Sequence, residues 1–117
     1  MKHKDLPYIH HILDEISKIE NSSYKLTKEL FESNVDLIDA MIRRIEIIGE
    51  AVKNLSPHLK ERYTNISWEN IAGMRDKLIH KYFEVDLDVV WNVISTDIPK
   101  LKEKILEIKK YLEINEI

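Results

Sequence analysis

The stretch VDLIDAMIRRIEIIGEAVKNL, residues 35–55, decides the fold of this chain. Its apolar residues recur at intervals of three and four, which is the pattern of one buried face of an α-helix. Gly49 lies inside this pattern, where glycine costs about 1 kcal/mol relative to alanine, so we interpret it as a site of close helix approach. The stretch predicts one long amphipathic helix, with a buried stripe of Leu37, Ile38, Met41, Ile42, Ile45, Ile48, Val52 and Leu55.

The segments on either side of this helix carry the same kind of pattern. Asp5 is the expected N-cap of a first helix that ends near residues 21–23, and a short capped helical segment is expected over residues 27–31. Ser-Pro ends the central helix, because proline is best tolerated in the first turn of a new one. A short helical piece is therefore expected over residues 57–63.

The second half of the chain predicts two more long helices. Ser67 is the expected N-cap of a helix that runs from residue 68 to about residue 83. Trp68 at its start is interpreted as a core or interface anchor, and so is Trp91 further on.

The last helix is expected to be capped by Asp86 or Asp88. Its apolar residues again alternate spacings of three and four, as in packed helices of a bundle. Pro99 removes one backbone donor and should kink the helix about one turn earlier, near Ser95. The apolar seam consists of Trp91, Ile94, Ile98, Leu101, Ile105, Ile108 and Leu112.

The composition agrees with a helical fold. The chain has 117 residues and only 2 glycines, whereas sheets depend on glycine-rich tight turns. A chain of this length makes one domain and buries enough surface for a core. We expect an all-α protein, a compact bundle of four long helices plus short helical pieces, with residues 1–117 as a single domain.

Several functional classes are excluded by residue counts. With no cysteine there is no disulfide, thiolate nucleophile, iron–sulfur cluster or cysteine zinc site. The net charge of −3 argues against a wholly basic nucleic-acid-binding surface, although a local basic groove stays open. His10 and His11 diverge by about 100° on a helix, so they make no paired metal site. No apolar run approaches the ~20 residues of a membrane span. We expect a cytoplasmic protein without a metal or cofactor.

Packing does not explain the stretch GMRDKLIHKYF, residues 73–83. On the expected helix, Arg75 projects from the middle of an apolar arc, yet a guanidinium needs partners for its donors. It is either an ion-paired residue of the fold, or a guanidinium that reaches water, or a functional residue. Asp76 lies one helical turn before His80 and is therefore expected to orient it.

Arg75 and His80 together suit the cleavage of RNA. An imidazole can exchange a proton at neutral pH, and an arginine can stabilise a phosphate as its charge builds. One histidine does not readily serve both as the base for the 2′-hydroxyl and as the acid for the leaving 5′-oxygen. A two-fold dimer that presents each residue twice would supply both groups.

The spacing of Arg75, His80 and Tyr82 reads as the Arg-x-x-x-x-His-x-Tyr motif of HEPN-domain proteins, and the chain more narrowly resembles the HepT toxins of HEPN/MNT toxin–antitoxin systems. The likeness covers essentially the whole chain. It includes RIEIIGEA at 44–51, Trp68, IAGMRD at 71–76, Val90-Trp91 and DIP at 97–99.

The resemblance implies an all-helical homodimer that cuts RNA without a metal ion. Arg75 and His80 would be the catalytic pair at the dimer interface, with Asp76 as a supporting residue. The partner would be a minimal nucleotidyltransferase antitoxin that silences the toxin by transferring AMP to Tyr82. A charged nucleotide there would repel and block RNA.

Other readings of the same residues stay open. Tyr82 is also interpretable as an aromatic that packs on the core or stacks a base. Lys77 and Lys81 are candidate contacts to the RNA backbone, but they also suit a solvated face. For Glu46 and Glu50, which lie a turn apart, surface pairing is the default, although the resemblance also raises them as structural or cleft-lining residues. The whole chain is alternatively a non-catalytic HEPN module that binds RNA or a nucleotidyltransferase, or a helical adaptor in which the motif arginine is merely ion-paired.

Overall fold

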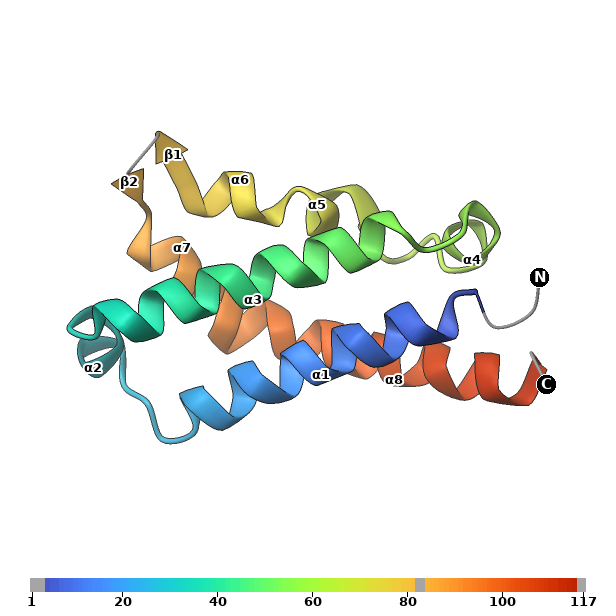
Figure 1. Cartoon of the computed structure of the whole chain (residues 1–117), viewed down its shortest axis with the longest axis horizontal. Coiled ribbons are helices and arrows are strands. Elements are labelled where there is room, and N and C mark those ends of the chain that lie inside the picture. The colour runs from blue at the N-terminus through green and yellow to red at the C-terminus, as the bar shows by residue number, and fades with distance from the viewer. Residues whose placement is uncertain (1–3, 82–83, 116–117) are drawn as a thin grey trace.

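The computed structural model describes residues 4–81 and 84–115, with the backbone alone for His80 and Lys81. Three long helices lie side by side in it. They are α1 (Leu6–Ser23), α3 (Val35–Lys53) and α8 (Ile98–Asn115), the three long ribbons of Figure 1. Their apolar faces contribute to one core. The all-α prediction is confirmed. Fully buried side chains from these helices include Ile9, Ile12, Ile16, Ile19, Met41, Ile45, Ile48, Ile105 and Ile108.

The central helix has the predicted buried face, and it ends at Lys53, two residues before the predicted end. Asn34 caps α3, because its side-chain oxygen accepts a hydrogen bond from the amide of Leu37. The two predicted short helices also form, as α2 (Lys28–Glu32) and α4 (Pro57–Arg62). Each begins with a hydroxyl cap, from Thr27 and Ser56 respectively.

The predicted capping role of Asp5 is wrong. Asp5 precedes α1, but its side chain makes no capping hydrogen bond. The carboxylate instead accepts two hydrogen bonds of 2.7 Å, from the amide and the hydroxyl of Ser56. Pro7 occupies the second position of α1 and has no N–H to offer, whereas Ser56 presents two donors. Asp5 therefore ties the start of α1 to the start of α4.

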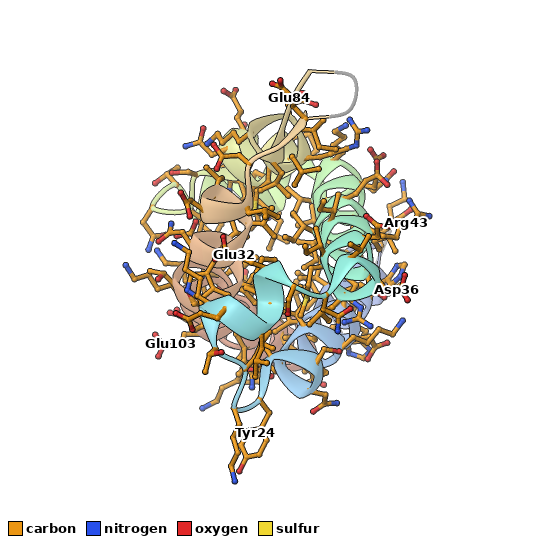
Figure 2. The ribbon with its side chains drawn as sticks, turned by 90° about the vertical axis from the view of Figure 1, so that its left-hand side faces the viewer. Tyr24, Glu32, Asp36, Arg43, Glu84 and Glu103 are labelled. Atoms are coloured by element: carbon orange, nitrogen blue, oxygen red, sulfur yellow. The ribbon has the colours of Figure 1, made fainter. Side chains whose placement is uncertain are left out.

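The long helix predicted over residues 68–83 does not form. The chain instead makes two five-residue helices, α5 (Trp68–Ala72) and α6 (Met74–Leu78), followed by strands β1 (Ile79–Lys81) and β2 (Glu84–Val85). The strands pair antiparallel, and Glu84 lies at the top of the end-on view in Figure 2. The predicted cap also fails, because the Ser67 side chain makes no capping hydrogen bond.

Local chemistry explains this change. Gly73, a poor helix former, separates α5 from α6 and donates its amide to the carbonyl of Glu69 at 3.0 Å. Ile79 then adopts an extended backbone, with φ −121° and ψ 106°. The sequence IHKYFEV at 79–85 is rich in the β-branched and aromatic residues that favour strands. The bundle accordingly has three long helices, and its fourth segment is short and broken.

The last segment is interrupted where the sequence predicts it. α7 (Leu87–Asn92) is capped by Asp86, which accepts a hydrogen bond from the amide of Val89 at 3.2 Å. A π-helical turn, η1 (Val93–Asp97), connects it to α8. Pro99 has no N–H for the carbonyl of Ser95, so the regular ladder is lost in this turn.

Aromatic anchors and one ion pair fix the shorter elements. Trp68 is buried and donates its indole N–H to the carbonyl of Tyr63 at 3.0 Å, and Trp91 packs against Phe31 with ring centroids 5.6 Å apart. Lys28 of α2 meets Asp88 of α7 at 2.7 Å, and this hydrogen bond raises the pKa of Lys28. None of the helices in the described ranges is long and apolar enough to span a membrane.

Candidate active site

Gly49 brings α3 against the end of α5. A Cβ atom at this position would lie 3.0 Å from the carbonyl oxygen of Ala72 and 3.2 Å from that of Ile71. Both distances are shorter than ordinary van der Waals contact, so only glycine fits without movement. The predicted close approach at Gly49 is confirmed. It sets the start of α6, and with it Arg75, beside the middle of α3.

Arg75 forms an ion pair across this contact. Its Nε lies 2.9 Å from Oε2 of Glu46, one turn before Gly49 on α3. The other oxygen of Glu46, Oε1, accepts a hydrogen bond of 2.7 Å from Arg43. The Arg75 side chain is 48% exposed, and Glu46 is 30% exposed. The ion pair considered as one explanation of Arg75 is therefore present, and the guanidinium also reaches solvent.

A pocket of about 260 Å³ opens beside this ion pair, between α3 and the α5–α6 segment. Its charged side chains come from both walls. Lys53 of α3 pairs with Glu50 at 3.2 Å, while Oδ1 of Asp76 lies 3.9 Å from Nη1 of Arg75, beyond hydrogen-bond distance. The lining residues are Ile45, Glu46, Gly49, Glu50, Lys53, Ala72, Gly73, Arg75 and Asp76. The pocket thus has charged side chains on both walls and an arginine at its edge.

The predicted helical relation between Asp76 and His80 is wrong, because α6 ends at Leu78. His80 belongs to β1, so the two residues do not lie one helical turn apart. Asp76 is 85% exposed and is placed next to Arg75 by the ion-pair contact. The amide of Asp86 donates to the carbonyl of Leu78 at 2.7 Å and so fixes the point where the hairpin begins.

The remaining candidate residues spread along the same segment. Lys77 is exposed on α6, and the backbone of Lys81 ends β1. Tyr82, the expected AMP acceptor, lies outside the described residues. Among the side chains that the structure describes, which leave out His80, no group of three or more histidine or acidic residues is arranged to hold a metal ion.

Sequence reasoning left the role of Glu46 open between surface pairing and the cleft, and it did not predict the contact with Arg75. The expected surface pairing is found for Glu50, with Lys53, and for one oxygen of Glu46, with Arg43. The contact to Arg75 depends on how near two helices come, which no local pattern contains. Gly49 is the signal that the sequence offers. A glycine at an expected close approach indicates that side chains one turn away on the same helix, such as Glu46, contact the neighbouring segment.

Comparison with known proteins decides the family. A family model described as "Ribonuclease HepT-like" matches residues 12–108, which is most of the chain. The chain belongs to the HepT-like ribonuclease family. The resemblance of the chain to HepT-like proteins is thereby confirmed, and the family is one of ribonucleases. No solved structure matches the chain.

Curated relatives agree with this assignment. The chain is 42% identical over 108 residues to "Probable ribonuclease HepT" of Thermococcus cleftensis, covering 92% of this chain and 96% of that protein. It is 42% identical over 102 residues to a "Putative RNase" of Caldanaerobacter subterraneus subsp. tengcongensis, covering 87% and 91% respectively.

A third relative is longer. The chain is 51% identical over 108 residues to a "Gamma-glutamylcyclotransferase and putative RNase" of Methanocaldococcus jannaschii. That match covers 92% of this chain and 49% of the relative, so the HepT-like chain spans about half the length of that protein.

Proposed function

We propose that this HepT-like chain is the toxin of a toxin–antitoxin pair, an endoribonuclease that cleaves cytoplasmic RNA without a metal ion. The observation that carries the proposal is the setting of Arg75. Its Nε is held by Glu46, and its half-exposed guanidinium stands at the edge of a pocket, five residues before His80. Membership of a ribonuclease family supports the same reaction.

The reaction needs three groups around one phosphate. The ribose 2′-hydroxyl gives its proton to a base and attacks the adjacent phosphorus, while an acid protonates the leaving 5′-oxygen. The products are a 2′,3′-cyclic phosphate and a 5′-hydroxyl. In our proposal Arg75 stabilises the charge on the phosphorane, because a guanidinium offers paired donors to phosphate oxygens.

We assign the proton transfers to His80. The base and the acid act on opposite sides of phosphorus, so one imidazole does not serve both. A homodimer that brings two copies of Arg75 and His80 to one cleft supplies the second imidazole. Asp76 then supports the site next to Arg75, and Lys77 and Lys81 contact the RNA backbone.

We further propose that a minimal nucleotidyltransferase antitoxin silences the enzyme. In this reaction the phenolic oxygen of Tyr82 attacks the α-phosphorus of a nucleoside triphosphate, and pyrophosphate leaves. The resulting AMP ester adds negative charge and bulk two residues from His80. An RNA phosphate would then be repelled from the site as well as blocked.

One observation weighs against cleavage at this pocket and leaves a second candidate function, a HEPN module that binds RNA or the nucleotidyltransferase without cleaving. The pocket beside Arg75 contains three acidic side chains, Glu46, Glu50 and Asp76, against two basic ones. The acidic side chains of a single pocket therefore outnumber its basic ones, whereas a strong phosphate site would be basic. The enzyme cleaves the RNA that it binds, whereas the binding module leaves that RNA intact.

The test uses purified chain whose intact mass shows no added AMP. We would incubate it with total cellular RNA in excess EDTA, beside Arg75→Ala and His80→Ala, and analyse the product ends. Cleavage that persists in EDTA, leaves 2′,3′-cyclic phosphates and disappears in both folded variants supports the enzyme. Intact RNA that is nevertheless bound supports the binding module. Intact mass after incubation with the antitoxin and ATP tests Tyr82, with Tyr82→Phe as the control.

A further inference from the structure

Glu46 lies between two arginines and uses a different oxygen for each. Oε2 contacts Nε of Arg75 at 2.9 Å, and Oε1 contacts Nη1 of Arg43 at 2.7 Å. Arg43 and Glu46 belong to α3, three residues apart, so this half of the arrangement is set within one helix. The Arg75 half crosses to α6. Arg43 is 68% exposed and projects outward from α3 (Figure 2).

The atoms in contact decide what Arg75 can still bind. A guanidinium has donors on Nε and on two terminal nitrogens, and pairs of these donors match the oxygens of a phosphate. Glu46 takes Nε. The Asp76 carboxylate is 3.9 Å from Nη1, too far for a hydrogen bond. The contact with Glu46 thus restricts the rotation of the side chain while it leaves the terminal nitrogens for another ligand.

We propose that Glu46 is a positioning residue that orients Arg75 toward the phosphate of the RNA. Arg43, on the other oxygen, holds the Glu46 carboxylate in place. This inference rests on the proposed function, because it concerns the same site. Preorganised donors stabilise a transition state without the cost of ordering a flexible side chain during the reaction.

The same carboxylate has a second, opposite effect. Glu46 contributes one of the three negative charges that line the pocket, and a negative charge beside the guanidinium repels a phosphate. Removal of Glu46 should therefore let RNA bind equally well or more tightly, while the bound RNA is cleaved more slowly. A residue that only maintains the fold does not separate binding from cleavage in this way.

The experiment measures kcat, KM and dissociation constant with one short RNA for wild type, Glu46→Ala and Glu46→Gln. For Glu46→Ala we expect kcat to fall about 10- to 100-fold, in line with the cost of misplacing a reacting group, with a dissociation constant equal to or below that of wild type. Glu46→Gln keeps an oxygen that accepts from Nε but loses the charge, so its kcat should fall less.

Glu50→Ala is the matched control. It removes an equal charge from the same pocket and the same helix, but Glu50 pairs with Lys53 and not with Arg75. Its kcat should stay much closer to that of wild type, although RNA binding tightens as it does for Glu46→Ala. Arg43→Ala should lower kcat less than Glu46→Ala, because it loosens the carboxylate but leaves the contact with Arg75.

Two results would overturn the proposal. One is a Glu46→Ala protein with the kcat of wild type. The other is a parallel loss of kcat, RNA binding and thermal stability in both Glu46 variants, because a residue that only maintains the fold would have that effect.

If the wild type itself does not cleave RNA, the proposed function fails, and a second measurement still tests whether Glu46 positions Arg75. The Nε–H resonance of Arg75 in a nitrogen–proton NMR spectrum should shift in Glu46→Gln and stay in place in Glu50→Ala, and an unchanged resonance in Glu46→Gln would contradict the contact.

Discussion

Replacement of Gly49 by alanine tests how the site is built. The new Cβ would lie 3.0 Å from the carbonyl oxygen of Ala72 and 3.2 Å from that of Ile71. Both neighbours are backbone atoms at the end of α5, so no flexible side chain can turn away. The α5 segment would have to move off α3 by a few tenths of an ångström, and Arg75 follows it in the chain.

Two effects of opposite sign set the magnitude. Alanine in place of glycine stabilises a helix by about 1 kcal/mol, while overpacking in a close contact typically costs about 1–3 kcal/mol. Because the contact is with rigid backbone, we expect overpacking to dominate, with a net loss of about 1 kcal/mol of unfolding free energy. In a domain of this size that lowers Tm by about 4 °C.

The assay combines urea unfolding with RNA cleavage, and the control is Gly73→Ala. A Cβ at Gly73 would lie 3.4 Å from the carbonyl of Glu69, an ordinary contact, so this variant should lose less stability than Gly49→Ala. Gly49→Ala should also cleave more slowly, because the contact between Arg75 and Glu46 is stretched. A Gly49→Ala protein as stable as wild type, or more so, would refute the reasoning.

Two further predictions concern the bundle away from the site. Asp5→Ala removes the acceptor of both hydrogen bonds from Ser56 and should lower the unfolding free energy by about 1–3 kcal/mol. Urea unfolding measures this loss, and an unchanged midpoint would show that the contact between the starts of α1 and α4 does not stabilise the fold. Phe31→Ala deletes a fully buried ring and should cost about 3–5 kcal/mol. Cleavage per folded molecule should stay at the wild-type level, since Phe31 is not among the pocket residues; a loss of activity in the folded fraction would contradict that separation.

The sequence predicts the long helices well, because their information is local. The apolar stripe of α3, the short helices α2 and α4, and the interruption before Pro99 all follow from spacing and from single residues. Tertiary contacts then agree with these local preferences. The single-domain prediction for residues 1–117 stays a prediction.

The segment of residues 68–83 was harder to predict because its local signals conflict. The apolar spacing of Ile71, Met74 and Leu78 suits a helix, whereas Gly73 and the strand-forming run from Ile79 do not. The outcome depends on partners outside the segment. These are α3, which packs on α5 and α6, and β2, which pairs with β1. The candidate residues were identified by their motif, while the contact of Glu46 with Arg75 was not predicted because it arises only from that packing.

The break after α6 has a consequence for the two candidate catalytic residues. On one continuous helix, Arg75 and His80 would move together as parts of a single rod. In the structure, Arg75 is joined to α3 through Glu46, whereas the backbone of His80 lies in a hairpin joined to the start of α7 by the hydrogen bond between Asp86 and Leu78. Different helices hold the arginine and the strand of the histidine. A change at Glu46 should therefore alter the orientation of Arg75 without displacing that strand, and a change at the hairpin should displace the strand without releasing Arg75 from Glu46. The rate of cleavage should therefore fall in Glu46→Gln while hydrogen exchange at the amide of Asp86, which donates to Leu78, stays at the wild-type level. Faster exchange at that amide in Glu46→Gln would show that the two supports are coupled after all.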